Sequence, residues 1–130
     1  MKVIEIITKQ KTEFLDVTDK ILKITRKENV KEGACVVFCP HTTAGLTINE
    51  NADPAVRKDM LSYLNRLVPE SKEYLHLEGN SDAHIKAALL GCSLNIIIKN
   101  SMLVLGSWQG VYFCEFDGPR SRKVYLKILK

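Results

Sequence analysis

The chain has 130 residues, of which 45% are hydrophobic and 26% are charged, and its formal net charge is +4. These values are typical of one soluble domain, residues 1–130, that buries its own hydrophobic core. So small a charge predicts no nucleic-acid partner, although Arg120-Ser121-Arg122-Lys123 is a dense basic cluster. No apolar run approaches a membrane span, and Glu5 stands where a signal peptide would be apolar. We therefore expect a cytoplasmic protein with no membrane partner.

The N-terminal part predicts strands on either side of a short helix. Residues 2–8 are rich in β-branched side chains and predict a first strand, and residues 14–17 predict a short second one. Thr18 is expected to be the N-cap of a helix, because apolar residues follow it at helical spacing. After Gly33, the apolar run 34–39 predicts a strand that is buried on both faces.

The middle of the chain predicts a strand and two helices. Leu46 and Ile48 alternate with polar residues, which predicts a strand with one polar face. Asp53-Pro54 begins a helix whose apolar positions are Val56, Met60, Leu64 and Leu67. An ordered loop over 70–80, anchored by Tyr74 and Leu77, leads to a helix from Ser81-Asp82 to Gly91. In that helix we expect Asp82 to be a capping residue and His84 to lie in the first turn.

The C-terminal part predicts strands over 93–99, 102–105, 108–116 and 124–128, with turns between them. In 108–116, Val111, Phe113 and Glu115 share one face, whereas Tyr112, Cys114 and Phe116 share the other. The whole pattern predicts an α+β fold: a single compact β-rich domain, mainly of antiparallel sheets, with about three helices.

Four cysteines, Cys35, Cys39, Cys92 and Cys114, are flanked by apolar or small residues, and no two have CxxC spacing. We expect buried free thiols, with Cys35 and Cys39 on one face of their strand. A structural zinc site or a disulfide framework is the alternative.

Polar side chains are concentrated directly after the apolar run 34–39. The segment 39–51 contains His41, three threonines, two asparagines and Glu50. Polar groups beside a buried strand need hydrogen-bond partners, which a ligand-binding cleft supplies. The alternative is an ordinary polar loop.

The three histidines, His41, His76 and His84, fall in predicted loops or at the end of an element, where binding sites usually lie. Three imidazoles can hold zinc with an open fourth position. They can equally donate protons or bind phosphate, because the histidine pKa lies near neutrality. For each histidine alone, a structural or solvated role is the alternative.

A second cluster follows in 108–122. Arg120 and Arg122 match the geometry of phosphate, although a hairpin with solvated arginines is the alternative. Trp108 either stacks on a ligand ring or fills the core. The carboxylates Glu50, Glu78 and Asp82 are candidates for acid–base catalysis or for a magnesium ion.

Four segments in order along almost the whole chain resemble the YjbQ-like family, whose members are described as secondary thiamine-phosphate synthases. They are His41 to Pro54, Glu78 to Lys86, Gly106-Ser107-Trp108-Gln109-Gly110, and Glu115 to Arg120. Gly45 stands where alanine or another small residue is common in the family. The resemblance implies a β-rich α+β homotrimer with a polar cleft near a subunit interface, built around His41, His76 and His84.

The reaction that the resemblance implies joins a pyrimidine methyl diphosphate to a thiazole phosphate and releases pyrophosphate. We expect His41, His76 and His84 to stabilise or protonate the leaving diphosphate. They would do so with a divalent metal (zinc or magnesium) or without one. Phosphate binding is assigned to Arg120 and Arg122. Asn49 and Glu50 would orient the substrate, Trp108 or Gln109 would line the ring pocket, and Thr42 and Thr43 would bind substrate.

Two other functions are compatible with the same residues. Three imidazoles and a nearby acid suffice for metal-assisted hydrolysis. A trimer that binds a small phosphorylated metabolite without turning it over is the second alternative.

Overall fold

The computed structural model describes residues 1–130 and confirms the α+β class. Its elements are β1 (Lys2–Ile7), β2 (Glu13–Asp16), α1 (Thr18–Lys27), β3 (Glu32–Phe38), β4 (Ala44–Glu50), α2 (Pro54–Leu67), α3 (Ser81–Leu90), β5 (Ser93–Lys99), β6 (Met102–Leu103), β7 (Gln109–Glu115) and β8 (Ser121–Leu129). None of the helices has the length and apolar composition needed to cross a bilayer.

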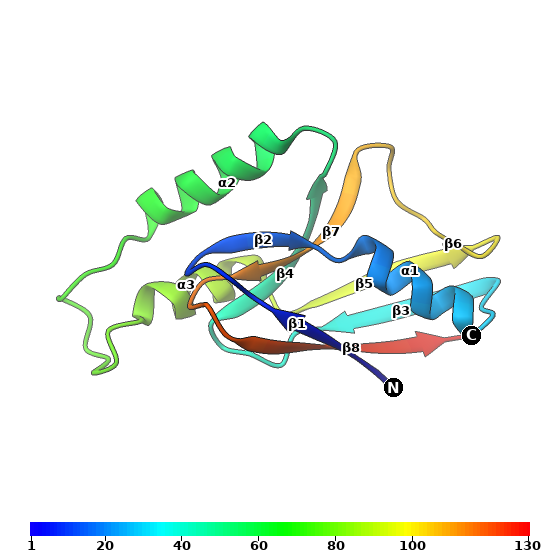
Figure 1. The fold of residues 1–130 in the computed structure, drawn as a ribbon, viewed down its shortest axis with the longest axis horizontal. Helices are drawn as coiled ribbons and strands as arrows, with labels where there is room; N and C mark the ends of the chain where they lie inside the picture. The colour runs from blue at the N-terminus through cyan, green and yellow to red at the C-terminus, as the bar shows by residue number, and fades with distance from the viewer.

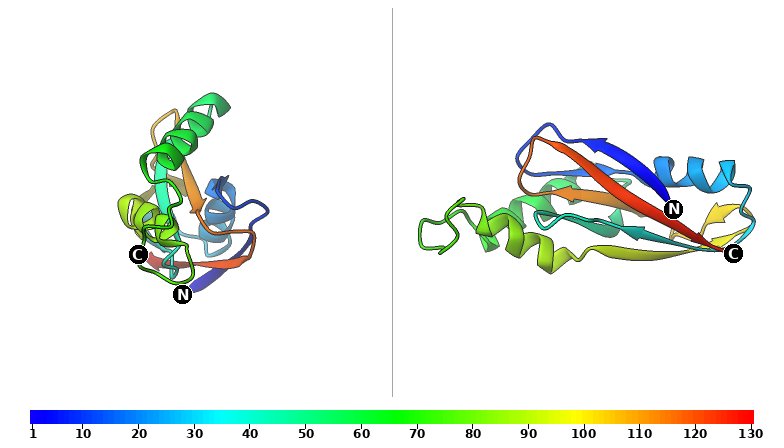
Figure 2. Two further views of the ribbon diagram at one scale, coloured as in Figure 1. Left: turned by 90° about the vertical axis from the view of Figure 1, so that its left-hand side faces the viewer. Right: turned by 90° about the horizontal axis from the view of Figure 1, so that it is seen from below.

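The strands form two antiparallel sheets. The larger has the order β1-β8-β3-β5-β6, and the smaller has the order β2-β7-β4. In Figure 1 the larger sheet forms the lower layer and the smaller sheet lies above it, with α1 beside them. Both termini lie at one end of the larger sheet, because β1 and β8 pair with each other (Figure 2).

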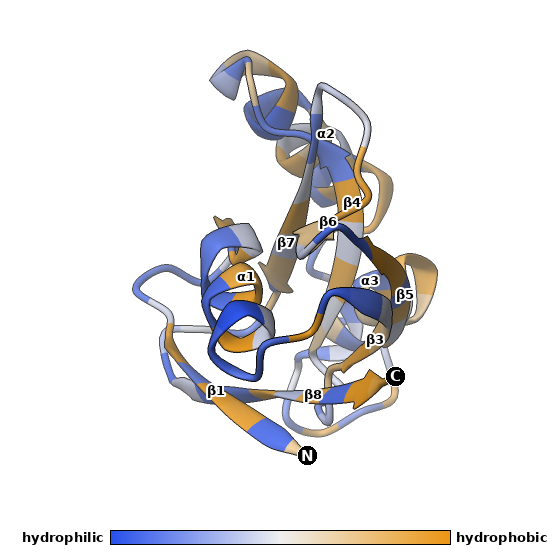
Figure 3. Ribbon diagram, turned by 90° about the vertical axis from the view of Figure 1, so that its right-hand side faces the viewer, coloured by the Kyte–Doolittle hydropathy of each residue, from blue (hydrophilic) through white to orange (hydrophobic).

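The main core lies between the two sheets. Alternate residues of the strands meet there, among them Cys35 and Val37 of β3 and Val111 and Phe113 of β7, and α1 contributes Ile21. Figure 3 shows the hydrophobic stretches gathered in β3, β5 and β7, whereas α1 is largely hydrophilic. The prediction that β3 is buried on both faces is wrong, because Ala34 and Val36 lie on an outer face that no other layer covers fully.

A second core covers the other face of the smaller sheet. Tyr112, Cys114 and Phe116 pack there against Ala83 and Ala87 of α3. The predicted two faces of 108–116 are therefore confirmed, and each face serves a different core. Close approach of α3 also explains the small residue in β4: a Cβ on Gly45 would lie 2.8 Å from the Gly91 carbonyl oxygen.

Helix α2 extends beyond the two sheets in Figure 1 and has no buried residue, although Met60 and Leu64 pack partly against the second core. It begins as predicted, with Asp53 accepting a hydrogen bond of 2.9 Å from the Ala55 N–H and Pro54 as the first helical residue. The helix ends at Leu67, the last of the apolar positions expected for it.

Several local predictions are wrong. The N-cap of α1 is Val17, because Asp16 already accepts hydrogen bonds from the N–H and the hydroxyl of Thr18 at 2.9 and 2.6 Å. Strand β6 stops at Leu103. Leu77 is fully exposed and anchors nothing, whereas the Tyr74 hydroxyl donates to the Pro69 carbonyl at 2.9 Å.

The cysteine prediction holds for three of the four residues. Cys35, Cys39 and Cys114 are buried free thiols, and burial raises the pKa of Cys35 and of Cys39 to about 11. Cys92 is free but exposed, because it lies in the surface connection between α3 and β5.

Candidate functional site

A hollow of about 410 Å³ opens beyond one end of the smaller sheet, and apart from Pro40 its lining is polar or charged. We call it the polar hollow. Its lining residues are Pro40, His41, Thr42, Thr43, His76, Glu78, Asn80, His84, Asp117, Arg120 and Arg122.

Strand pairing brings these distant segments together. Ala44, the first residue of β4, pairs with Glu115, the last residue of β7. The connection before β4 and the turn after β7 therefore meet at one edge. The start of α3 and the loop 70–80 close the hollow from the other side, which places all three histidines around it.

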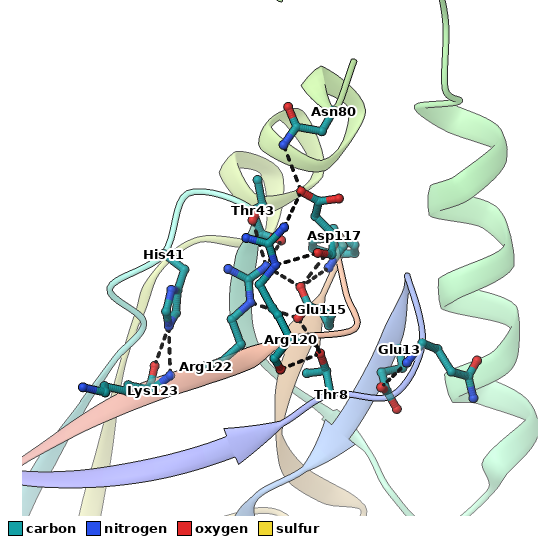
Figure 4. A network of polar contacts seen from close by, with 12 residues as sticks. Thr8, Glu13, His41, Thr43, Asn80, Glu115, Asp117, Arg120, Arg122 and Lys123 are labelled. Carbon is teal, nitrogen blue, oxygen red and sulfur yellow. Dashed lines mark hydrogen bonds and ion pairs between the residues drawn. The ribbon is translucent and has the colours of Figure 1, made fainter. Parts of the chain in front are cut away.

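Arg122 and Glu115 form a buried ion pair below the hollow (Figure 4). Arg122 Nε donates to Glu115 Oε1 at 2.9 Å, and Arg122 Nη2 contacts Glu115 Oε2 and donates to Thr43 Oγ1 at 2.8 Å. Burial by itself raises the pKa of Glu115, but hydrogen bonds from Arg122 and from Thr8 hold the pKa below its usual value. Arg122 thus places a positive charge at the base of the hollow. Its Nε and Nη2 groups already have hydrogen-bond partners.

Asp117 ties the turn after β7 to the start of α3. Its Oδ2 accepts from Asn80 Nδ2 at 2.9 Å and from Arg120 Nη2 at 3.0 Å, as Figure 4 shows. Arg120 Nε also donates to the Asp117 carbonyl at 2.9 Å. The Arg120 side chain remains half exposed, so it is the guanidinium with free surface for an anion.

His41 lies beside the first residues of β8, which β3 does not pair with. Its Nε2 lies 2.9 Å from the Lys123 backbone nitrogen and 3.1 Å from the Lys123 carbonyl oxygen, so the tautomer of the ring decides which of the two it bonds, and the ring lies edge-on to Phe113. Lys123 lies beyond Tyr125, where the pairing of β8 with β3 ends, so the imidazole replaces a strand partner. Burial lowers the pKa of His41 below 6.5, and the charge of Arg122 lowers it further. The neutral form of the ring is therefore favoured.

His76 and His84 face each other across the hollow's outer part. Their rings are 5.4 Å apart between centroids and meet edge to face, and His76 Nε2 is 3.8 Å from Glu78 Oε2. No group of three or more histidine, cysteine, aspartate or glutamate side chains is arranged to hold a metal ion. One ring nitrogen of His41 is engaged by the Lys123 backbone, and the three-histidine metal centre stays a prediction from the sequence.

Four predicted substrate-binding or catalytic residues lie elsewhere. Glu50 pairs with Gln109 and Asn49 with Gly110, at the end of β4 and β7 opposite to Ala44 and Glu115. Six residues of strand separate the two ends by about 20 Å. Trp108, at the same far end, is 65% exposed, so it fills no core either. These four residues do not join the polar hollow of their own chain.

Sequence reasoning missed Asn80 and Asp117 as lining residues. Both lie inside segments that resemble the YjbQ-like family, Glu78 to Lys86 and Glu115 to Arg120, and this resemblance could have identified them. Asp82, predicted as a cap, is instead buried and paired with Lys86 on another face of α3.

A second hollow, of about 370 Å³, adjoins the first and shares His41, Thr42 and His84 with it. Small side chains complete its lining: Ala44, Ala87, Ala88, Gly91 and Cys92. We call it the alanine-lined hollow. The two together offer a polar compartment next to one with a partly apolar wall.

Comparison with known proteins places this arrangement in a family. The model of the family described as UPF0047 protein YjbQ-like matches residues 2–130. The UPF0047 protein MJ1081 of Methanocaldococcus jannaschii is 51% identical over 96% of this chain and 91% of its own length. YugU of Bacillus subtilis is 45% identical over 99% and 98%. A crystal structure of an uncharacterized conserved protein of the YjbQ/UPF0047 family from Clostridium acetobutylicum, 52% identical, superposes with a TM-score of 0.96 over 99% of this chain and 100% of that one. The chain belongs to the YjbQ/UPF0047 family.

Proposed function

We propose that the polar hollow binds the phosphate groups of a small phosphorylated metabolite. The observation that carries the proposal is its lining, in which three imidazoles, two guanidiniums and two threonine hydroxyls outnumber two carboxylates and Pro40 is the one residue without a polar side chain. Guanidinium and hydroxyl groups are preferred partners of phosphate oxygens. Asn80 Oδ1, which has no hydrogen-bond partner, leaves an acceptor for a hydroxyl or amino group of the ligand.

The alanine-lined hollow supports a ligand that also carries an organic ring. Its small side chains leave a partly apolar wall next to the phosphate compartment. Volumes of about 410 and 370 Å³ are each within the usual range of small-molecule sites. A phosphorylated heterocycle therefore fits the pair of hollows better than inorganic phosphate alone does.

The reaction we propose is that of a secondary thiamine-phosphate synthase, at a low rate. The bond between the pyrimidine methyl carbon and the diphosphate oxygen breaks, and the thiazole nitrogen forms the new bond to that carbon. Arg120 and Thr42 would hold the departing diphosphate, and His76 and His84 would donate hydrogen bonds or a proton to it. His41 would donate a hydrogen bond to the diphosphate, while Arg122 positions Thr43. Substrate-binding or catalytic roles for Asn49, Glu50, Trp108 and Gln109 remain predictions from the sequence.

The same proposal includes a homotrimer in the cytoplasm. The trimer rests on the family resemblance. Four free cysteines, one of them exposed, support a reducing compartment.

The test is release of pyrophosphate from the pyrimidine methyl diphosphate in the presence of the thiazole phosphate, together with calorimetric binding of each substrate. His84→Ala and Arg120→Met should each lower turnover by about tenfold or more. Lys23→Met, an exposed change on α1, is the matched control and should leave turnover unchanged.

Three other results have defined meanings. Tight binding without turnover favours the non-catalytic phosphometabolite binder. Hydrolysis that a chelator abolishes, with metal found by elemental analysis and lost in His41→Ala and His84→Ala, favours the metal-assisted hydrolase. Wild-type binding of neither substrate contradicts a phosphate-binding hollow.

A further inference from the structure

A separate polar pocket of about 250 Å³ lies on another face of α3 from His84. It is lined by Lys11, Thr12, Asn65, Glu70, Asp82 and Lys86. We call it the Asp82 pocket. None of its lining residues lines the polar hollow, and the proposed reaction does not use them.

Asp82 has unmet hydrogen-bonding capacity inside this pocket. Its side chain is 1% exposed, and neither carboxylate oxygen accepts a hydrogen bond. Lys86 Nζ is 3.6 Å and Lys11 Nζ 4.0 Å from Oδ2, so both supply charge without a hydrogen bond. A buried carboxylate left without donors is unfavourable, and so the pocket favours a ligand that brings N–H or O–H groups.

The lysines beside Asp82 have hydrogen-bond donors to spare. Lys86, whose side chain is 3% exposed, makes one hydrogen bond, to Asn65 Oδ1 at 2.8 Å, although an ammonium group has three N–H donors. Lys11 is half exposed and contacts Glu70. The pocket therefore combines open acceptors and open donors a few ångströms apart.

The signs of these charges select the ligand class. Two ammonium groups, of Lys11 and Lys86, and two carboxylates, of Asp82 and Glu70, line the pocket, so a metal cation and an inorganic anion each meet charges of their own sign there. A molecule with both an ammonium and a carboxylate can pair its ammonium with a carboxylate of the pocket and its carboxylate with a lysine. The small volume and the absence of hydrophobic lining exclude a large apolar side chain.

We propose that the Asp82 pocket binds a small zwitterionic amino acid, with its ammonium group on Asp82 and its carboxylate on Lys86 and Lys11. This site is independent of the proposed phosphate site. The two share no lining residue, although helix α3 and the loop 70–80 contribute residues to both.

The experiment is isothermal titration of the full-length protein with glycine, and in parallel with methylammonium chloride and with sodium acetate. Glycine should bind saturably and more tightly than either half-molecule. Lys11→Met should weaken glycine binding by about tenfold, because one charge-assisted contact is lost. Lys20→Met, an exposed lysine on α1, is the matched control and should bind like the wild type.

Asp82→Asn should abolish glycine binding, with Asp19→Asn as its control. Because Asp82→Asn leaves the Lys86 charge buried and unpaired, its fold is checked by circular dichroism. If this variant does not fold, Lys11→Met decides. The proposal is overturned if glycine does not bind the wild type, if methylammonium or acetate binds as tightly as glycine, or if Lys11→Met binds glycine unchanged.

Discussion

At the scale of single residues, the Glu115–Arg122 pair is the feature on which the candidate site rests. Glu115 accepts from Arg122, from Thr8 at 2.8 Å, and from the backbone N–H groups of Phe116 and Asp117 at 3.1 Å each. One carboxylate thereby joins β7, β8 and the residue that follows β1, and its partner Arg122 holds Thr43 at the hollow. Removing the carboxylate charge should affect stability as well as ligand binding.

Glu115→Gln should lower the free energy of unfolding at pH 7 by about 3–5 kcal/mol, because it leaves the buried Arg122 charge uncompensated. The pKa of Glu115 is lower in the folded chain than its usual 4.5. Its ionised contribution is therefore complete above the unfolded pKa and is lost as the pH falls through the folded value. Urea unfolding from pH 7 to pH 3 should show the difference between wild type and variant shrinking at the acid end.

Glu5→Gln is the control for this change, because Glu5 is exposed. It should stay within about 0.5 kcal/mol of the wild type. A Glu115→Gln stability equal to that of Glu5→Gln at pH 7 would show that the pair contributes little.

At the scale of elements, α2 differs from the other helices because it has no buried residue. Tertiary packing supplies most of the stability of helices in proteins. Local features such as the Asp53 cap and Pro54 therefore matter more for α2 than for α1 or α3, which bury Ile21 and Ala83 respectively.

Asp53→Ala should weaken α2 by about 1 kcal/mol, since the Ala55 N–H loses its acceptor. Hydrogen exchange of the amides in residues 55–67 should accelerate about fivefold, while exchange in β7 stays unchanged, because the helix opens locally. Lys58→Ala, an exposed change on the same helix, is the control. Equal acceleration in α2 and β7 would instead mean that α2 is coupled to global unfolding.

At the scale of the whole molecule, a single chain leaves apolar side chains uncovered. Leu75 is 96% exposed and Leu77 fully exposed, on the loop that brings His76 to the polar hollow. Ile97 and Leu129 are also exposed, on the larger sheet. Uncovered apolar groups of this kind are typical of surfaces that associate.

Sedimentation equilibrium should give three times the mass of one chain. The double change Leu75→Ser and Leu77→Ser should shift the protein toward smaller species, because it removes apolar area that association would bury. Lys72→Ser, on the same loop, should keep the wild-type mass. A wild-type protein with the mass of one chain at micromolar concentration would contradict the trimer.

Most elements follow from the sequence alone, although β3 was expected to be buried on both faces and is not. Apolar spacing predicted three helices and the two-faced strand 108–116, because periodicity is a local property of the chain. The sequence also selected the histidines and arginines that line the polar hollow, although it grouped Asn49, Glu50, Trp108 and Gln109 with them. It misjudged Leu77, Cys92 and Asp82, whose burial depends on what other segments cover.

Only the tertiary structure decided which groups meet. The register of β4 against β7 places Glu115 at the hollow and sends Glu50 to the far end. Contacts between residues more than 80 positions apart, such as His41 with Lys123 and Thr8 with Glu115, give these side chains their hydrogen-bond partners. The physical reason is that burial, pKa and hydrogen-bond partners are properties of neighbours in space, which chain connectivity does not specify.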